Sequence, residues 1–166
     1  MFHKTINVID VEMECWADKS PGRIIQIGIC QVDIQKVEII KGDHFYINNR
    51  DISDYCTKLT GITQRMSDAG HPENMIKSIL LEKYNLKKNM WASWGTQDVK
   101  CMKKYDWPSN GNHIDVRRIF PLFFGNDPKS LTKSLNDIGL EFEGRPHCAM
   151  WDAYNTSKII IEILKR

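Results

Sequence analysis

The chain has 166 residues, of which 42% are hydrophobic and 27% are charged, and its formal net charge is +2. This length fits one domain with one core and is too short for two full domains. A mean hydropathy of -0.43 and the lack of any apolar run of bilayer length exclude disordered and membrane-spanning chains. The mild positive charge permits a polyanionic partner without requiring one.

The N-terminal segment and the cysteines bear on the cellular compartment. The segment "MFHKTINVIDVE" has only a short apolar stretch, interrupted by Asp10 and Glu12, and lacks a small-residue cleavage site, so it does not have the features of a signal peptide. The five cysteines are scattered, odd in number and never in a C-x-x-C pair, which predicts neither a disulfide framework nor a zinc knuckle. We expect a cytoplasmic protein with reduced, mostly buried cysteines and no membrane partner.

The first half of the chain predicts strands followed by helices. Runs rich in β-branched residues at 5–14, 23–34 and 36–47 predict three adjacent strands, the last two forming a hairpin around "DIQK". Segment 51–68 predicts two short helices capped by Ser53 and Thr63 and separated at Gly61. Helical spacing of apolar residues predicts a helix over 71–86, and 89–95 returns to strand.

The second half predicts mainly helices. We expect a helix over 96–107 that begins near Asp98, and a short strand leading into a helix over 112–120. A further helix over 127–140 ends at Gly139, and a final amphipathic helix covers 149–166. Early strands with later alternation of helices and strands predict an α/β or mixed α+β layout, with no linker or repeat that divides the chain.

Two carboxylates lie close together on the first predicted strand. Asp10 and Glu12 are two residues apart, so their side chains point to the same face of the sheet and repel each other. A cation between them removes this repulsion, and carboxylate oxygens suit Mg²⁺ or Mn²⁺. The alternative is an edge strand with a solvated acidic face.

Three further residues add to this acidic pair. Asp98 follows "WASWGTQ" at the junction of a strand and a helix, where a carboxylate can cap the helix and also face a cleft. Asp152 can be an ordinary first-turn carboxylate of the last helix. Helix capping does not explain His147, so the structural explanation becomes strained when it must cover all five residues together.

The order of these residues resembles a known nuclease family. D-x-E in the first strand, an Asp at the start of a middle helix and H-x-x-x-x-D before the last helix are similar to the DEDDh 3′-5′ exonucleases. The segments "SDYCTKLTGIT", "WASWGTQD" and "GRPHCAMWDAYNTSKII" resemble most the branch that contains the 3′ histone-mRNA exonuclease and its RNA-interference relatives. The resemblance runs from about Val8 to Leu164 and implies a ribonuclease H-like α/β fold, with a five-stranded mixed sheet flanked by helices on both faces. A single exonuclease domain over 1–166 is expected.

The resemblance also implies roles for the polar residues. The family's metal ligands correspond to four acids: Asp10, Glu12, Asp98 and Asp152. They would hold two Mg²⁺ or Mn²⁺ ions roughly 4 Å apart, an arrangement that supports phosphodiester hydrolysis. His147 corresponds to the general base; the Tyr-type sister branch would place Tyr where this chain has Cys148.

Residues that bind the 3′-terminal nucleotide are implied by the same resemblance. They are Met13, Tyr55, Leu59, Thr60, Gly61 and Trp94. Core packing explains Tyr55 and Trp94 equally well. Arg145 can contact a phosphate. Basic pairs at 87–88, 103–104 and 117–118 can widen a basic track, although most such pairs are solvated surface.

We therefore expect a metal-dependent 3′-5′ exonuclease that converts single-stranded ends to nucleoside 5′-monophosphates, with RNA favoured over DNA by the resemblance. A recruiting protein is a candidate partner. The alternatives are a DNA-trimming or proofreading-type exonuclease of the same superfamily, and a non-catalytic module that binds nucleic acid or protein. The complete set of repelling acids argues against the binding module, which has no need of them.

Overall fold

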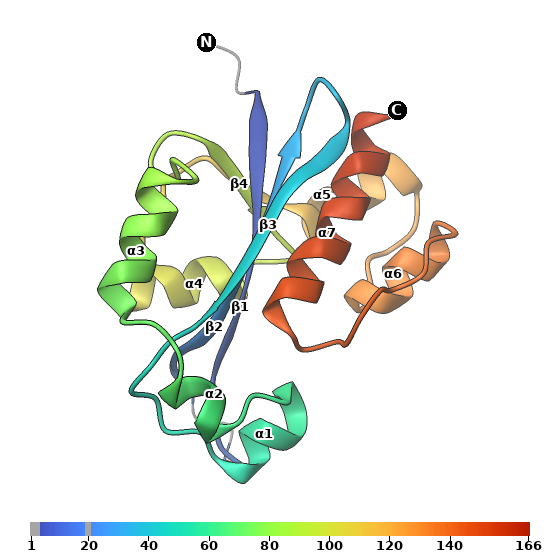
Figure 1. Cartoon of the computed structure of the whole chain (residues 1–166). Coiled ribbons are helices and arrows are strands. Elements are labelled where there is room, and N and C mark those ends of the chain that lie inside the picture. The colour runs from blue at the N-terminus through green and yellow to red at the C-terminus, as the bar shows by residue number, and fades with distance from the viewer. Residues whose placement is uncertain (1–3, 19–20) are drawn as a thin grey trace.

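The sheet has five strands and combines antiparallel and parallel pairs. The structure is a computed structural model that describes residues 4–18 and 21–166, so the first three residues of the N-terminal segment lie outside it. The strands are β1 (Thr5–Cys15), β2 (Pro21–Asp33), β3 (Glu38–Tyr46), β4 (Met90–Ser93) and β5 (His113–Asp115). Their order is β3-β2-β1-β4-β5, antiparallel from β3 to β1 and parallel from β1 to β5 (Figure 1). The predicted five-stranded mixed sheet is confirmed. Because β1 is the central strand, the alternative of an edge strand with a solvated acidic face is wrong.

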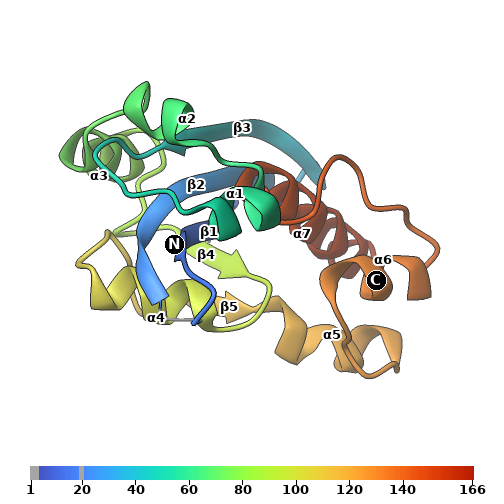
Figure 2. The ribbon, with the colours of Figure 1, turned by 90° about the horizontal axis from the view of Figure 1, so that it is seen from below.

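Helices cover both faces of this sheet, as expected. They are α1 (Asp54–Thr60), α2 (Gln64–Asp68), α3 (Glu73–Glu82), α4 (Gln97–Lys104), α5 (Val116–Phe124), α6 (Leu131–Asp137) and α7 (Ala149–Leu164). Buried side chains of α3 and α4 join one hydrophobic cluster, and those of α5, α6 and α7 join a second cluster on the other face. Figure 2 shows these two layers from the end of the sheet where α1 and α2 lie.

The short segments around the sheet begin and end where the sequence indicates. The Asp33 carboxylate accepts the backbone N–H groups of Gln35 and Lys36 at 2.8 and 2.9 Å, which forms the predicted hairpin turn. Ser53 and Thr63 cap α1 and α2 through their hydroxyl oxygens, and Gly61 ends α1 with a φ of 76°. Only a residue that tolerates the left-handed region suits that last position.

Alternation along β1 decides which layer the acidic pair faces. Ile9 and Val11 belong to the cluster under α3 and α4, whereas Ile6 and Val8 belong to the cluster under α7. The even-numbered positions continue through Asp10 and Glu12, because side chains alternate between the two faces of a strand. The acidic pair is therefore directed towards the α7 layer.

A close contact between α7 and β2 brings the start of α7 to the acidic pair. Gly28 pairs with Asp10 across the β1–β2 ladder, and a Cβ atom on Gly28 would lie 2.1 Å from the backbone oxygen of Ala149. The buried side chain of Gln26 accepts the Ala149 N–H at 3.0 Å. Only glycine lets the helix approach the strand this closely, and the first turn of α7 is fixed beside β1 as a result.

Two further predictions concern the cysteines and the membrane. All five cysteines are free thiols; Cys30, Cys56 and Cys101 are buried, and Cys15 and Cys148 are partly buried. Within the described ranges, no helix has the length and apolar character needed to cross a bilayer.

Candidate active site

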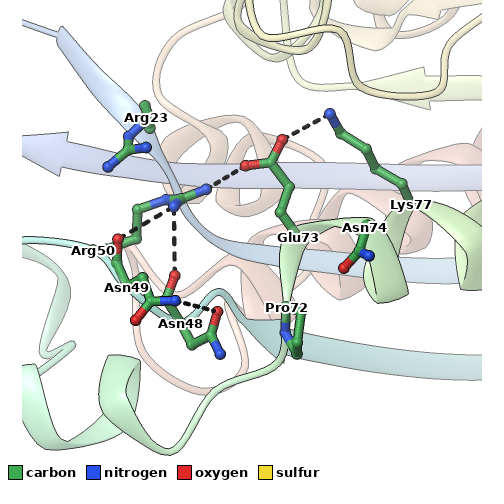
Figure 3. Close-up of a pocket in the computed structure, with 8 residues that line it drawn as sticks. All are labelled: Arg23, Asn48, Asn49, Arg50, Pro72, Glu73, Asn74 and Lys77. Carbon is green, nitrogen blue, oxygen red and sulfur yellow. Dashed lines mark hydrogen bonds and ion pairs between the residues drawn. The ribbon is translucent and has the colours of Figure 1, made fainter.

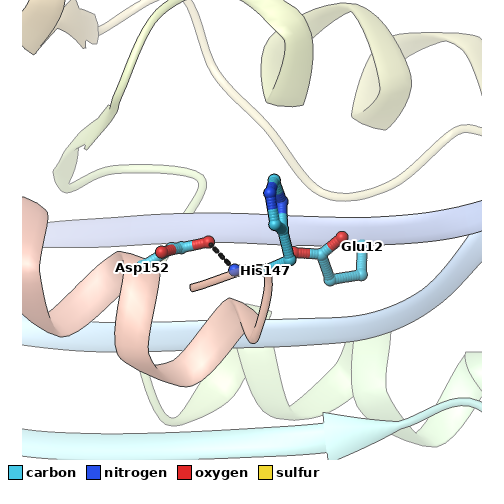
Figure 4. Close-up of side chains that lie close together, drawn as sticks. All are labelled: Glu12, His147 and Asp152. Atoms are coloured by element: carbon cyan, nitrogen blue, oxygen red, sulfur yellow. Dashed lines mark hydrogen bonds between the residues drawn. The ribbon is translucent and has the colours of Figure 1, made fainter. Parts of the chain in front are cut away.

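Three of the predicted site residues meet at the start of α7. One ligand atom from each of Glu12, His147 and Asp152 lies within 4.8 Å of the others (Figure 4). Glu12 comes from β1, His147 from the loop before α7 and Asp152 from the first turn of α7. Asp10 lines the same cavity as His147 and Asp152, which has a volume of about 340 Å³. The docking of α7 on β2 thus brings residues far apart in the sequence to one place.

Asp98 reaches this site from the opposite layer. It lies in the first turn of α4, is only 7% exposed, and accepts the backbone N–H of Val11 at 3.1 Å. Its carboxylate therefore contacts β1 between Asp10 and Glu12. The Thr96 side chain, at the N-cap position of α4, makes no cap hydrogen bond. Asp98 lies in the first turn of α4, and its carboxylate also lies beside the acidic pair.

The four acids make the site strongly unfavourable for negative charge. Burial raises the pKa of Glu12 to about 8, with Asp152 and Asp98 adding to the effect. Burial, followed by the charges of Asp98 and Glu12, raises the pKa of Asp10 well above its ordinary value. Burial also raises the pKa values of Asp98 and Asp152 to about 6, although hydrogen bonds from the backbone oppose this. None of the four is paired with a cationic side chain among the described residues.

Partly buried carboxylates that repel one another fit a divalent metal ion. Carboxylate oxygens are the ligands that Mg²⁺ and Mn²⁺ prefer, and a bound cation reverses the unfavourable charge. The donor set of this site therefore agrees with the metal centre expected from the sequence. His147 lies close enough to Glu12 and Asp152 to act as a further ligand or as a proton acceptor next to them.

The loop that carries His147 is fastened to α7. The His147 N–H donates to Asp152 Oδ2 at 3.1 Å, and His147 itself adopts a positive φ of 59°. Earlier in the loop, the fully buried Asn155 side chain accepts the Glu143 N–H at 3.0 Å and donates to the Glu143 carbonyl at 2.8 Å. The Trp151 ring packs against Gly144, where a Cβ atom would lie 2.1 Å from the ring. These contacts fix the backbone of the loop that carries His147.

Asn155 was missed in the sequence, although a signal was present. It lies three residues after Asp152, at a position where the helix is otherwise buried against the sheet. A buried amide needs hydrogen-bond partners, and the nearest unpaired backbone groups are those of a loop before the helix. A polar residue on the buried face of α7 therefore indicates that its side chain holds the loop before α7 through hydrogen bonds to the loop backbone.

The predicted nucleotide-binding residues are distributed over two places. Trp94 borders the 340 Å³ cavity and also stacks edge-to-face on Phe120 at 5.8 Å, so it takes part in core packing as well. Met13 borders a separate cavity of about 160 Å³ with Gln97 and Tyr105. Met13 therefore lies apart from the cavity that Asp10 borders.

The residues of α1 form the other group. Tyr55 and Leu59 are 42% and 41% exposed, so core packing does not explain Tyr55. Thr60 is buried and its hydroxyl donates to the Cys56 carbonyl at 2.9 Å, which makes it part of the helix end. Arg145 lies against Gly61, because a Cβ atom there would be 1.7 Å from the guanidinium. The His147 loop thus touches the end of α1 through Arg145.

Another cavity, of about 480 Å³, contains none of the predicted site residues (Figure 3). Arg50 is buried there, donates to the Ile24 carbonyl at 2.9 Å and pairs with Glu73, which also binds Lys77 at 2.7 Å. This network fastens the start of α3 to the segment after β3. The charged groups of Arg50, Glu73 and Lys77 are paired with one another, so we assign the network a structural role.

A mixed five-stranded sheet with four acids and a histidine beside its central strand is the arrangement expected of the ribonuclease H-like class. The family model for Exonuclease (RNase_T) matches residues 7–160, and the chain belongs to this family. The predicted membership of the DEDDh exonucleases is confirmed by this match and by the relatives described next.

Several curated proteins are similar along nearly the whole chain. ERI1 exoribonuclease 2 of Xenopus laevis is 29% identical, with 95% of this chain and 28% of the relative covered. The 3'-5' exonuclease Snipper of Drosophila melanogaster is 28% identical over 95% of this chain and 68% of its own length. Human 3'-5' exoribonuclease 1 is 27% identical over 99% of this chain and 53% of its own length. The chain thus spans about a quarter to a half of the length of these two exoribonucleases.

Solved structures share the fold. The nuclease domain of 3'hExo, a DEDDh family member bound to rAMP, superposes with a TM-score of 0.86 at 22% identity, covering 99% of this chain and 93% of that domain. Exonuclease I superposes with a TM-score of 0.75 at 16% identity over 98% of this chain and 41% of its own. The ribonuclease H-like fold predicted from the sequence is confirmed.

Proposed function

We propose that this chain is a metal-dependent 3′-5′ exonuclease that removes nucleoside 5′-monophosphates from single-stranded ends, with RNA preferred over DNA. The observation that carries the proposal is the group of four acids beside His147: burial raises all four pKa values, and neighbouring acids raise those of Asp10, Glu12 and Asp98 further. A binding module gains nothing from such repulsion. The names of the relatives, which include exoribonucleases, support the choice of RNA.

Each acid has a part in this proposal. Asp10, Glu12, Asp98 and Asp152 would hold two Mg²⁺ or Mn²⁺ ions. When bound, such ions activate a water molecule and stabilise the negative charge that develops at phosphorus. The hydrogen bond from Val11 orients Asp98, and the N–H of His147 orients Asp152. Oriented ligands need little rearrangement when a cation binds.

His147 is proposed as the general base. Its ring lies on an exposed loop beside Glu12 and Asp152, where it can accept a proton from the attacking water. A histidine suits this task because its ordinary pKa is near neutrality. Asn155 and Trp151 hold the loop in the required place.

The 3′-terminal nucleotide is proposed to bind towards α1. Tyr55 and Leu59 offer exposed apolar surface there, and Arg145 adds a cation at Gly61. Stacking on an aromatic ring accepts any base and contributes roughly 1–3 kcal/mol per base. A recruiting protein is also part of the proposal. A cytoplasmic location is also proposed, since five free cysteines suit a reducing compartment.

The test is degradation of matched 5′-labelled RNA and DNA strands by the purified protein in Mn²⁺. We expect a ladder that shortens from the 3′ end, faster with RNA, release of nucleoside 5′-monophosphates, and no reaction in excess EDTA or with a 3′-phosphate. Asp10→Asn and Asp152→Asn should abolish turnover, whereas the exposed Asp127→Asn serves as the matched control and should not.

The outcomes separate the alternatives. Equal or faster loss of the DNA strand overturns the preference for RNA and supports the DNA-trimming enzyme. Binding of the strands without any shortening supports the non-catalytic module. Cleavage of a circular strand contradicts an exonuclease altogether.

A further inference from the structure

Two basic side chains border the same cavity as the acids. Asp10, His147 and Asp152 border it, and so do Arg117 and Lys129. Arg117 comes from the first turn of α5, and Lys129 from the segment before α6. Two cations therefore share a cavity of about 340 Å³ with the proposed centre of catalysis.

The two cations differ in their availability. Lys129 is paired with Asp137 at 3.0 Å. Arg117 is exposed, and its side chain makes no hydrogen bond or ion pair with the residues that the structure describes. A cation in the first turn of a helix also opposes the helix dipole, so Arg117 does not stabilise α5 where it stands. Its guanidinium is free for an anionic ligand.

The position of this cavity along β1 indicates which part of a strand it would take. Asp10 borders the cavity, whereas Met13 lies three residues further along β1, about 10 Å away, and borders the separate cavity beside α4. α1, which presents Tyr55 and Leu59, lies beyond the Met13 end of β1 (Figure 1). The Arg117 cavity is thus on the other side of the acids from the proposed site for the terminal nucleotide.

We propose that this cavity binds the penultimate nucleotide, and that Arg117 binds the phosphate on the 5′ side of that nucleotide. The inference rests on the proposed exonuclease function. The scissile phosphate would lie at the acids, with the terminal nucleotide towards α1 and the rest of the strand leaving past α5. A guanidinium matches a phosphate through two parallel hydrogen bonds, which suits a backbone contact that ignores base sequence.

The inference has a direct consequence for short substrates. A trinucleotide without terminal phosphates has one phosphate upstream of its scissile phosphate, whereas a dinucleotide has none. The wild-type protein should therefore cleave the trinucleotide with a higher kcat/KM than the dinucleotide. A charge-assisted contact at an exposed position corresponds to a ratio of about 10.

The experiment measures this ratio in Mn²⁺ for the wild type, Arg117→Ala and Arg118→Ala. Arg118 is the matched control, because it is the adjacent exposed arginine on α5 and does not border the cavity. We expect the ratio to fall about 10-fold in Arg117→Ala and to stay at the wild-type value in Arg118→Ala. The salt dependence of binding should lose about 0.7 in its logarithmic slope, as expected for one phosphate contact on a single strand.

A chemical substitution in the substrate tests the same contact between Arg117 and the upstream phosphate. A trinucleotide whose upstream phosphate is replaced by an uncharged methylphosphonate should be cleaved about 10-fold more slowly by the wild type. Arg117→Ala should show no additional loss with this substrate, because the two changes remove the same contact.

The results distinguish failure of the inference from failure of the function. If the wild type degrades a longer RNA from its 3′ end but Arg117→Ala keeps the wild-type ratio, the assignment of the cavity is wrong. A methylphosphonate penalty that is equally large in Arg117→Ala also overturns it. If the wild type degrades no strand from the 3′ end, the proposed function fails and the inference fails with it.

Discussion

Replacing Glu12 by Gln is expected to stabilise the metal-free protein near pH 8. Burial and the neighbouring Asp152 and Asp98 raise the pKa of Glu12 to about 8, from an ordinary value of 4.5. The folded chain therefore holds this proton more tightly than the unfolded chain does. Stability is highest at low pH and is lost as the pH rises from about 4.5 through about 8.

The size of the effect follows from the same numbers. A pKa near 8 against 4.5 corresponds to roughly 5 kcal/mol once Glu12 is fully ionised. Water reaches part of the Glu12 side chain, so we take less than half of this, about 2 kcal/mol, after screening. Gln has the same shape without the charge. For a domain of this size the gain corresponds to a rise in Tm of about 4–8 °C.

The assay is thermal unfolding in EDTA across pH 5–9. At pH 5 the variant and the wild type should unfold at similar temperatures. Glu12 of the folded wild type is protonated at this pH and is therefore as neutral as Gln. At pH 8 the variant should unfold at the higher temperature, and Glu82→Gln, an exposed Glu outside the cluster, should match the wild type. Adding Mn²⁺ should stabilise the wild type more than the variant, since ligands stabilise the state that binds them.

A variant that unfolds at or below the wild-type temperature at pH 8 in EDTA would refute the reasoning. It would mean that the charge of Glu12 is already compensated without a metal ion. An Mn²⁺ effect of equal size in both proteins would exclude Glu12 as a ligand.

Three further predictions follow from the contacts around α7. His147→Ala should lower kcat by about 10²–10⁴ while Mn²⁺ still raises Tm; loss of the Mn²⁺ effect with an unchanged rate at saturating metal would make His147 a ligand instead. Asn155→Ala should lower activity, destabilise the chain by about 1–3 kcal/mol because the Glu143 backbone groups lose their partner, and speed proteolysis in the loop before His147; an unchanged proteolytic pattern would contradict the anchoring role. Gly28→Ala should lower Tm and weaken Mn²⁺ binding because its Cβ atom overlaps α7, whereas Gly111→Ala, which has open space around it, should leave both measurements unchanged.

Local patterns were sufficient to predict much of the fold. Alternation along β1 correctly placed Asp10 and Glu12 on one face, since that depends only on the period of a strand. Caps such as Ser53 and Thr63 marked the starts of helices because their hydrogen bonds are made within one turn. The order of the acids, compared with a known family, then predicted the ribonuclease H-like fold.

Features that depend on tertiary packing were not predicted. The approach of α7 to Gly28 and Gln26 joins positions more than a hundred residues apart, and no local pattern encodes it. Arg117 belonged to one of several basic pairs in the sequence, and only the packing of α5 against β4 and α7 places it in the cavity with Asp10. Met13 and Trp94 were expected in one pocket but border different cavities, because they reach the site from opposite layers.

The acidic site connects the two helical layers, because Asp98 lies on α4 and Asp152 lies on α7. We call this connection the joint. The contact of Asp98 with Val11 spans 87 residues of sequence, and contacts of such long range form late in folding. Without metal, mutual repulsion at the joint favours opening of the α7 layer as a separate cooperative unit, while α3 and α4 stay on the sheet. With metal, the bound ions link the two layers, and amide hydrogens of α7 and of α4 should then exchange through openings of one common free energy.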